Sequence, residues 1–207
     1  MKGLLRKDYY MLFRNCRMLL LVIFIFLPLS ALQEGGAFLI FYPALLISLL
    51  PSTLLAYDER DHWDSYCMTL PCTKSQLVAS KYLLGLLNSS VVILLSMLVC
   101  LLRMSLTASF STTELYTTFC LQAIISCLAP AFVLPFMFRY GTEKGRLVYY
   151  VVVVLFCMVT YGSPDILSKT DIILSKGFFG LVTIAAFVIY GLSCLLSIRL
   201  YQKREIA

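Results

Sequence analysis

The sequence has 207 residues, of which 60% are hydrophobic and 14% are charged, with a mean hydropathy of +0.89 and a net charge of +6. Soluble domains contain about 45–50% apolar and about 25% charged residues, so this composition excludes a soluble enzyme, a soluble nucleic-acid-binding domain and a disordered chain. We therefore expect an integral membrane protein of the all-α class.

Six long stretches of the sequence lack charged side chains, and each is predicted to form a transmembrane helix. A helix needs about 17–25 mostly apolar residues to cross a bilayer, and only the first stretch falls just short of that length. The stretches are apolar on all sides rather than alternating, which disfavours a β-barrel. Residues 18–207 are thus expected to form one six-span domain. The predicted spans cover residues 18–33, 37–57, 82–102, 115–138, 147–163 and 177–198.

Residues 1–17, which precede the first span, are predicted to form a basic amphipathic helix on the inner membrane surface. Their apolar side chains have helical spacing, and most basic residues lie on the other faces. The alternative is an irregular charged leader that only fixes the topology. The predicted apolar stripe consists of Leu5, Tyr9, Leu12, Phe13 and Cys16.

The distribution of Lys and Arg predicts the orientation of the spans. An even number of spans puts both termini on the same side, and if that side is the cytoplasm only Arg103, Lys169 and Lys176 of the 17 basic residues lie outside. The positive-inside rule therefore places both termini in the cytoplasm. The basic charge then faces the anionic lipids of the inner leaflet, and no nucleic-acid partner is needed to explain it.

The last outside loop and the last span contain two further features. Residues 163–176 begin with Ser-Pro-Asp and then contain apolar residues, so both a short helix dipping into the outer leaflet and an ordinary packed loop remain open. In the last span, Gly177, Gly180 and Gly191 are predicted to let helices approach closely, within the bundle or across a dimer. The alternative is that they are the ordinary glycines of membrane helices.

Motifs that carry chemistry are missing from the sequence. It has no phosphate-binding loop, no GxSxG and no HExxH, and the only histidine is His62. We expect no catalytic residue, no metal site and no cofactor bound by this chain.

The loop of residues 58–81 between the second and third spans contains the most informative pattern. Trp63, Tyr66, Cys67 and Leu70 have the spacing of one face of a short helix that ends at Pro71. A second helix is predicted to begin with a capping box from Thr73 to Gln76 and to enter the third span through Lys81. An aromatic face on a cytoplasmic helix indicates docking onto a partner, although it could also lie on the lipid surface.

Residues 69–82, preceded by Glu59, resemble the corresponding loop of the ABC-2 type permeases, the small six-span membrane subunits of ABC exporters. The shared pattern is an acidic residue, Leu-Pro, a hydroxyl residue, a basic residue and a lysine–aromatic pair entering the third span. Lys74 stands where arginine is commoner.

The resemblance implies a bacterial cytoplasmic-membrane protein that works as two permeases, homo- or heterodimeric, with two copies of a separate ATP-binding subunit. That subunit would bind ATP and Mg²⁺, so this chain would not itself be an enzyme, and residues 58–70 would form the coupling helix seated in it. The residues implied to contact the ATPase are Glu59, Asp61, Trp63, Asp64, Tyr66, Cys67 and Leu70. The loop motif adds Pro71, Thr73, Lys74 and Lys81.

The cargo is less well defined by the sequence. Small members of the family are similar to exporters of amphipathic peptides such as the phenol-soluble modulins, and 14 Phe and 13 Tyr residues suit a hydrophobic or amphipathic substrate.

Two alternatives to an exporter permease remain open. One is the substrate-binding membrane subunit of an energy-coupling-factor importer, whose alanine-x-x-x-alanine face is absent from the first span. The other is a non-transporting membrane assembly or immunity factor.

Overall fold

The computed structural model describes residues 2–32, 37–67, 69, 73–107, 112–162 and 176–203, and the secondary structure within these ranges is entirely α-helical. The helices are α1 (Lys2–Asn15), α2 (Arg17–Leu32), α3 (Ala37–Ser48), α4 (Leu50–Arg60), α5 (Trp63–Cys67), α6 (Lys74–Thr107), α7 (Thr112–Tyr140), α8 (Thr142–Gly162) and α10 (Lys176–Lys203).

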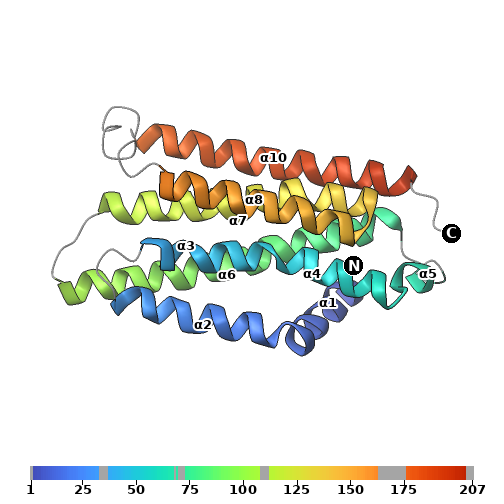
Figure 1. Ribbon diagram of the computed structural model, residues 1–207, viewed down its shortest axis with the longest axis horizontal. Coiled ribbons are helices and arrows are strands. Elements are labelled where there is room, and N and C mark those ends of the chain that lie inside the picture. Colours follow the sequence, from blue (N-terminus) through green and yellow to red (C-terminus); the bar gives the residue numbers. More distant parts are fainter. Residues whose placement is uncertain are drawn as a thin grey trace.

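The long helices lie side by side along one axis of the molecule. In Figure 1, α2, α3 with α4, α6, α7, α8 and α10 all run along this axis, whereas α1 is set at an angle to it. Four segments gather at one end of the molecule, which we call the α5 end. They are the short helix α5, the start of α1, the turn between α7 and α8, and the end of α10. These are the four segments that the sequence analysis places in the cytoplasm.

The lengths of the helices support a multi-pass membrane protein. Within the described ranges, four segments are long and apolar enough to cross a bilayer, and a fifth is obtained if α1 and α2, which meet at an angle of 74°, are counted as one span. By itself α2 has only 16 residues. The side chains of α8 are described only as far as Val154. The count of six spans and the side of the membrane that the α5 end faces therefore stay predictions.

The predicted span 37–57 consists of two helices rather than one. The break lies at Leu49, whose N–H bonds to the carbonyl of Leu46 in a tight turn. Pro51 follows in the first turn of α4, and it has no N–H to donate to the carbonyl of Ile47. Together the two pieces still have the length and hydropathy of one span, from Phe41 to Arg60.

Helix α1 packs against the bundle with a row of residues spaced by four. Leu4, Asp8, Leu12 and Cys16 are all buried, and α1 contacts α2, α4 and α6. Burial raises the pKa of the Cys16 thiol, so this cysteine is a protonated packing residue. The predicted stripe differs at Phe13, which is 61% exposed. The buried row is centred on a charged residue that an apolar pattern does not include.

Polar side chains connect α6, α7 and α10 inside the bundle. Pro135 has no N–H, which leaves the carbonyl of Ala131 in α7 without its helical partner. Ser193 of α10 donates to that carbonyl at 2.6 Å. The hydroxyl of Tyr82 in α6 lies 2.9 Å from Ser193 Oγ and 2.7 Å from Ser197 Oγ. The freed backbone group is therefore satisfied by a side chain of the neighbouring helix.

Helices α7 and α8 form a tight hairpin at the α5 end. Gly141 has a φ of 87° and donates its N–H to the carbonyl of Met137 at 2.9 Å, which ends α7. Gly145 packs so closely against Met137 that a side chain at this position would collide with it. Both glycines thus serve the close turn between α7 and α8.

Candidate functional site

Four charged side chains form a buried cluster at the α5 end, which we call the ion cluster. It consists of Lys7 and Asp8 of α1, Asp58 of α4 and Lys81 of α6. Lys81 Nζ lies 2.7 Å from Asp8 Oδ1 and 2.5 Å from Asp58 Oδ2. Lys7 Nζ lies 2.5 Å from Asp58 Oδ1 and 3.4 Å from Asp8 Oδ1. The cluster thus connects three helices through ion pairs.

The charges of the ion cluster balance, which is what makes their burial tolerable. Asp8, Asp58 and Lys81 are each 1% exposed. An isolated charge in such a place costs several kcal/mol, and removing one partner of a buried pair costs about 3–5 kcal/mol. Two lysines and two aspartates leave no net charge. The arrangement therefore fixes α1, α4 and α6 relative to one another as long as all four members are present.

Helix α5 lies directly beside the ion cluster. Lys7 Nζ is 4.0 Å from the ring centroid of Trp63, so the same ammonium group contacts both the aromatic ring and Asp58. Trp63 and Cys67 pack against the hydrophobic core that includes Leu55 and Tyr82. Tyr66 is 58% exposed, and its ring centroid lies 5.3 Å from that of Trp63.

The helix is shorter than the predicted coupling helix of residues 58–70, and its aromatic residues do not share one exposed face. Residues 58–60 belong to α4, and the chain turns at Asp61 and at His62, which has a φ of 52°. His is one of the residues enriched in this left-handed region. The side chains predicted to share one apolar face are separated, because Trp63 and Cys67 pack in the hydrophobic core whereas Tyr66 lies at the surface.

Glu59 connects α4 to the hairpin of α7 and α8. Its carboxylate accepts a hydrogen bond from the N–H of Thr142 at 2.8 Å, at the first residue of α8. A carboxylate at this place satisfies one of the free amides of the helix and opposes the positive end of its dipole. Beside this contact lies a polar cleft of about 570 Å³ whose lining includes Arg60, Lys144 and Arg146.

The remaining predicted site residues are spread over the α5 end. Asp61 is exposed and caps α4, and Asp64 lies in α5. Thr73 precedes α6, and its Oγ1 accepts from the N–H of Gln76 at 3.4 Å, which is one half of the predicted capping box. Lys74 Nζ lies 5.9 Å from the ring centroid of Tyr201. Leu70 and Pro71 lie outside the described residues.

The three glycines predicted for helix packing differ in their surroundings. Gly177 lies in the first turn of α10 and is exposed. A Cβ added to Gly180 would lie 2.8 Å from the hydroxyl of Tyr116 in α7, whereas a Cβ added to Gly191 would meet nothing within 4 Å. Of the last two, only Gly180 lies close to another helix of the same chain.

Three members of the ion cluster, Lys7, Asp8 and Asp58, were not among the predicted site residues. Lys7 was predicted only as one of the basic residues on the cytoplasmic side. Asp8 falls between the apolar positions of the predicted stripe. One signal was present, since Asp8 continues the spacing of four from Leu4 to Leu12 and Cys16. Within the described residues, no group of three or more His, Cys, Asp or Glu side chains could hold a metal ion.

The long apolar helices define a multi-pass membrane protein, and the ion cluster connects three helices at its α5 end. A family model described as ABC-2 family transporter protein matches residues 3–202. The chain therefore belongs to the ABC-2 transporter family and is a multi-pass protein of the bacterial plasma membrane. Membership implies a permease role in an ABC transporter with an ABC ATPase as partner. No curated protein sequence matches the chain.

Proposed function

We propose that the protein is the permease subunit of an ATP-driven exporter and that α5 is its contact with a separate ATP-binding subunit. Two permeases would work with two ATPases, which bind the ATP and Mg²⁺. Family membership supports the permease role and the ATPase partner. The direction of transport and the contact through α5 are our inference.

The observation that carries this proposal is the connection between α5 and the long helices. Trp63 of α5 lies under Lys7, and Lys7 pairs with Asp58, which in turn pairs with Lys81. A displacement of α5 would therefore act on α1 and α4 through Lys7 and on α6 through Asp58. Chains of packed side chains and ion pairs such as this one carry energetic coupling between distant sites.

Glu59 extends the same connection to a further helix. It is adjacent to Asp58, and its carboxylate bonds to the first amide of α8. Neighbouring residues at the end of α4 thus contact the start of α8 and, through Lys81, the start of α6. A movement of α4 would be transmitted to the ends of two helices that cross the bundle (Figure 1).

Among the α5 side chains that the structure describes, Tyr66 is the one best placed to meet the ATPase. It is 58% exposed, whereas Trp63 is partly buried behind it. Aromatic anchors at protein interfaces typically contribute about 2 kcal/mol or more when truncated. Asp61 would lie at the rim of the contact, where charges contribute less and are screened by salt.

For the cargo, we propose a hydrophobic or amphipathic substrate, with a peptide as the first candidate. The support is compositional: 60% of the residues are hydrophobic and 14% are aromatic. A path between such helices suits an apolar cargo better than a charged sugar.

The test is the recovery of the ATPase with a tagged permease purified from its own membrane, with the ATPase identified by mass spectrometry. We expect Tyr66→Ala to weaken binding of the ATPase about 30-fold, as a loss of about 2 kcal/mol requires, and so to lower its recovery. Trp63→Ala should also loosen the ATPase and abolish ATP-driven export, whereas Asp64→Asn should do much less. The recovery is measured at two salt concentrations, which separates anchor residues from rim charges.

Tyr150→Ala is the matched control, because Tyr150 is 61% exposed but lies on α8. Trp63→Phe keeps an aromatic ring in the core and controls for loss of folding. Equal recovery and full transport with Tyr66→Ala and Trp63→Ala would show that α5 is not the coupling element. Co-purification of a second large membrane protein instead of one type of ATPase would favour the importer alternative.

A further inference from the structure

We propose that a groove between α7 and α10 binds an anionic phospholipid of the inner leaflet, with an acyl chain in the groove and the phosphate at Arg139. The groove has a volume of about 430 Å³. Small-molecule sites in proteins have volumes of about 300–1,000 Å³ and are mostly apolar with a few placed polar groups. This site differs from the ion cluster and uses none of its residues.

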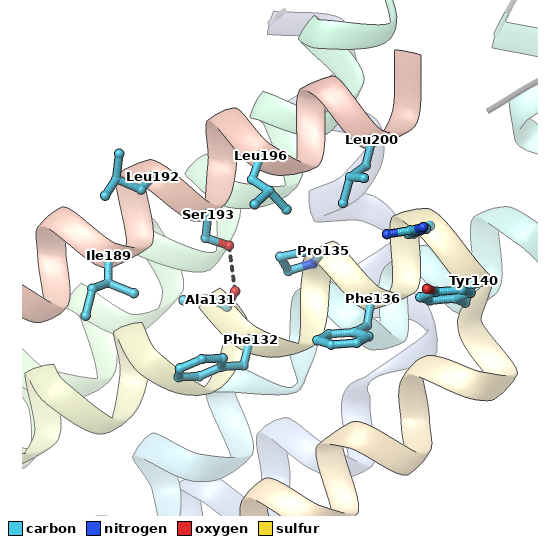
Figure 2. A pocket seen from close by; sticks show the side chains of 11 residues that line it. Ala131, Phe132, Pro135, Phe136, Tyr140, Ile189, Leu192, Ser193, Leu196 and Leu200 are labelled. Carbon is cyan, nitrogen blue, oxygen red and sulfur yellow. Dashed lines mark hydrogen bonds between the residues drawn. The ribbon is translucent and has the colours of Figure 1, made fainter. Parts of the chain in front are cut away.

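The walls of the groove are two rows of apolar side chains. Figure 2 shows Phe132 and Phe136 of α7 on one side and Leu192, Leu196 and Leu200 of α10 on the other. Four of these apolar side chains are between 45% and 60% exposed, namely Phe132, Phe136, Leu192 and Leu196. Side chains of this kind at a membrane-facing surface are suited to contact hydrocarbon.

The backbone carbonyl that a proline frees in the floor of the groove has a hydrogen-bond partner. Pro135 frees the carbonyl of Ala131, and Ser193 donates to it at 2.6 Å (Figure 2). A free carbonyl would favour water or a polar ligand, because leaving it unpaired in hydrocarbon is costly. With that carbonyl satisfied, the floor suits an acyl chain.

The length and the polarity of the groove match one leaflet. The wall of α7 runs from Phe132 to Tyr140, which at 1.5 Å per residue is about 12 Å. The hydrocarbon of one leaflet is about 15 Å thick, half of a bilayer core. Arg139 lines the groove near the α5 end, next to Tyr140. The groove is therefore apolar along its length and cationic near the end that is predicted to be cytoplasmic.

Arg139 is free to bind a phosphate. It is exposed, and its guanidinium lies 5.0 Å from the ring centroid of Tyr140, so the ring supports one face of the group. In the described part of the chain, none of the ion pairs involves Arg139. Arginine forms paired hydrogen bonds to phosphate, and basic pockets between membrane helices on the cytoplasmic side bind anionic headgroups. This charge complementarity favours an anionic lipid over an uncharged one.

Native mass spectrometry of the full-length protein in detergent tests the proposal. The probes are phosphatidylglycerol and phosphatidylcholine with the same acyl chains, each added in titration. We expect one phosphatidylglycerol per chain to be retained in preference to phosphatidylcholine. Arg139→Gln should lower retention of phosphatidylglycerol about fivefold, because one basic residue contributes about 1 kcal/mol to binding anionic lipid. It should leave phosphatidylcholine unchanged.

Two matched variants separate the groove from the general surface. Arg199→Gln removes an exposed arginine of α10 that does not line the groove, and it should leave the preference intact. Phe132→Ala removes part of a wall and should weaken both lipids, whereas Phe119→Ala, at another exposed phenylalanine of α7, should not.

Three outcomes would overturn the proposal. The first is equal retention of the two lipids by the unmodified protein, and the second is equal loss with Arg139→Gln and Arg199→Gln. The third is a change of oligomeric state with Phe132→Ala without a change in lipid retention, which would assign the groove to a second copy of the chain. None of these results bears on recovery of the ATPase through α5.

Discussion

Lys81 and Tyr82 are adjacent in α6, and their side chains bind different helices of the bundle. Lys81 pairs with Asp8 of α1 and Asp58 of α4, whereas the hydroxyl of Tyr82 bonds to Ser193 and Ser197 of α10. The tyrosine also accepts, at its main-chain carbonyl, a hydrogen bond from Tyr190. The lysine–aromatic pair at the entry of the third predicted span thus has a structural reason, since it fixes α6 on two sides.

Removing one charge from the ion cluster should destabilise the protein strongly. Lys81→Met leaves two buried aspartates with a single lysine, and we expect the free energy of unfolding to fall by about 3–5 kcal/mol. The double variant Lys81→Met, Asp8→Leu leaves the pair of Lys7 and Asp58, so its charges balance again. The double variant should regain more than half of the stability that Lys81→Met loses, measured by thermal denaturation in detergent.

Lys144→Met is the control for this comparison, because Lys144 is exposed and its removal should change the melting temperature little. An unchanged melting temperature for Lys81→Met would contradict a structural role of the cluster.

Glu59 should protect the first amide of α8 from solvent exchange. Glu59→Ala removes the acceptor of the Thr142 N–H, and loss of such a cap costs about 0.5–2 kcal/mol. Glu59→Gln keeps an acceptor oxygen and should lose only the interaction of the charge with the helix dipole, about 0.3–1 kcal/mol. Hydrogen exchange of the peptide containing residues 142–146 should therefore rise in the order wild type, Gln variant, Ala variant. A rise that is the same for both variants would argue against a capping role.

Gly180 and Gly191 should respond differently to the same substitution. At Gly180 a side chain would collide with the hydroxyl of Tyr116, whereas at Gly191 the space is open. Overpacking of a close contact costs about 1–3 kcal/mol. We expect Gly180→Leu to lower thermal stability and Gly191→Leu to leave it unchanged. If only Gly191→Leu alters the oligomer size on gel filtration, that glycine belongs to a contact between copies.

The predicted topology can be checked by cysteine labelling in whole cells, in a background without native thiols. Cysteine at Ser111 or Lys169 should react with an impermeant maleimide from outside, because both lie in predicted external loops. Cysteine at Thr142 should not, because Thr142 lies in the α7–α8 turn at the α5 end (Figure 1). Labelling of Thr142 from outside would rule out a cytoplasmic α5 end.

The sequence by itself determined the features that depend on local composition. The apolar stretches predicted a helical membrane protein, and Phe41–Arg60, Lys74–Ser105, Leu115–Tyr140 and Phe179–Gln202 have the length and hydropathy of spans. The start of α6 at Thr73 was also predictable, because a cap is a contact between residues three positions apart. The resemblance of residues 69–82 predicted the family, which the match over residues 3–202 confirms.

Only the tertiary structure decided how the charged residues at the α5 end are used. Lys81 and Asp8 are 73 positions apart, and Lys7 and Asp58 are 51 apart, so no local pattern joins them. The same holds for α5, where packing against the core turned Trp63 inward and left Tyr66 at the surface. A charge is stable in such a place only with its partners, and which helices bring those partners together depends on how the whole bundle packs.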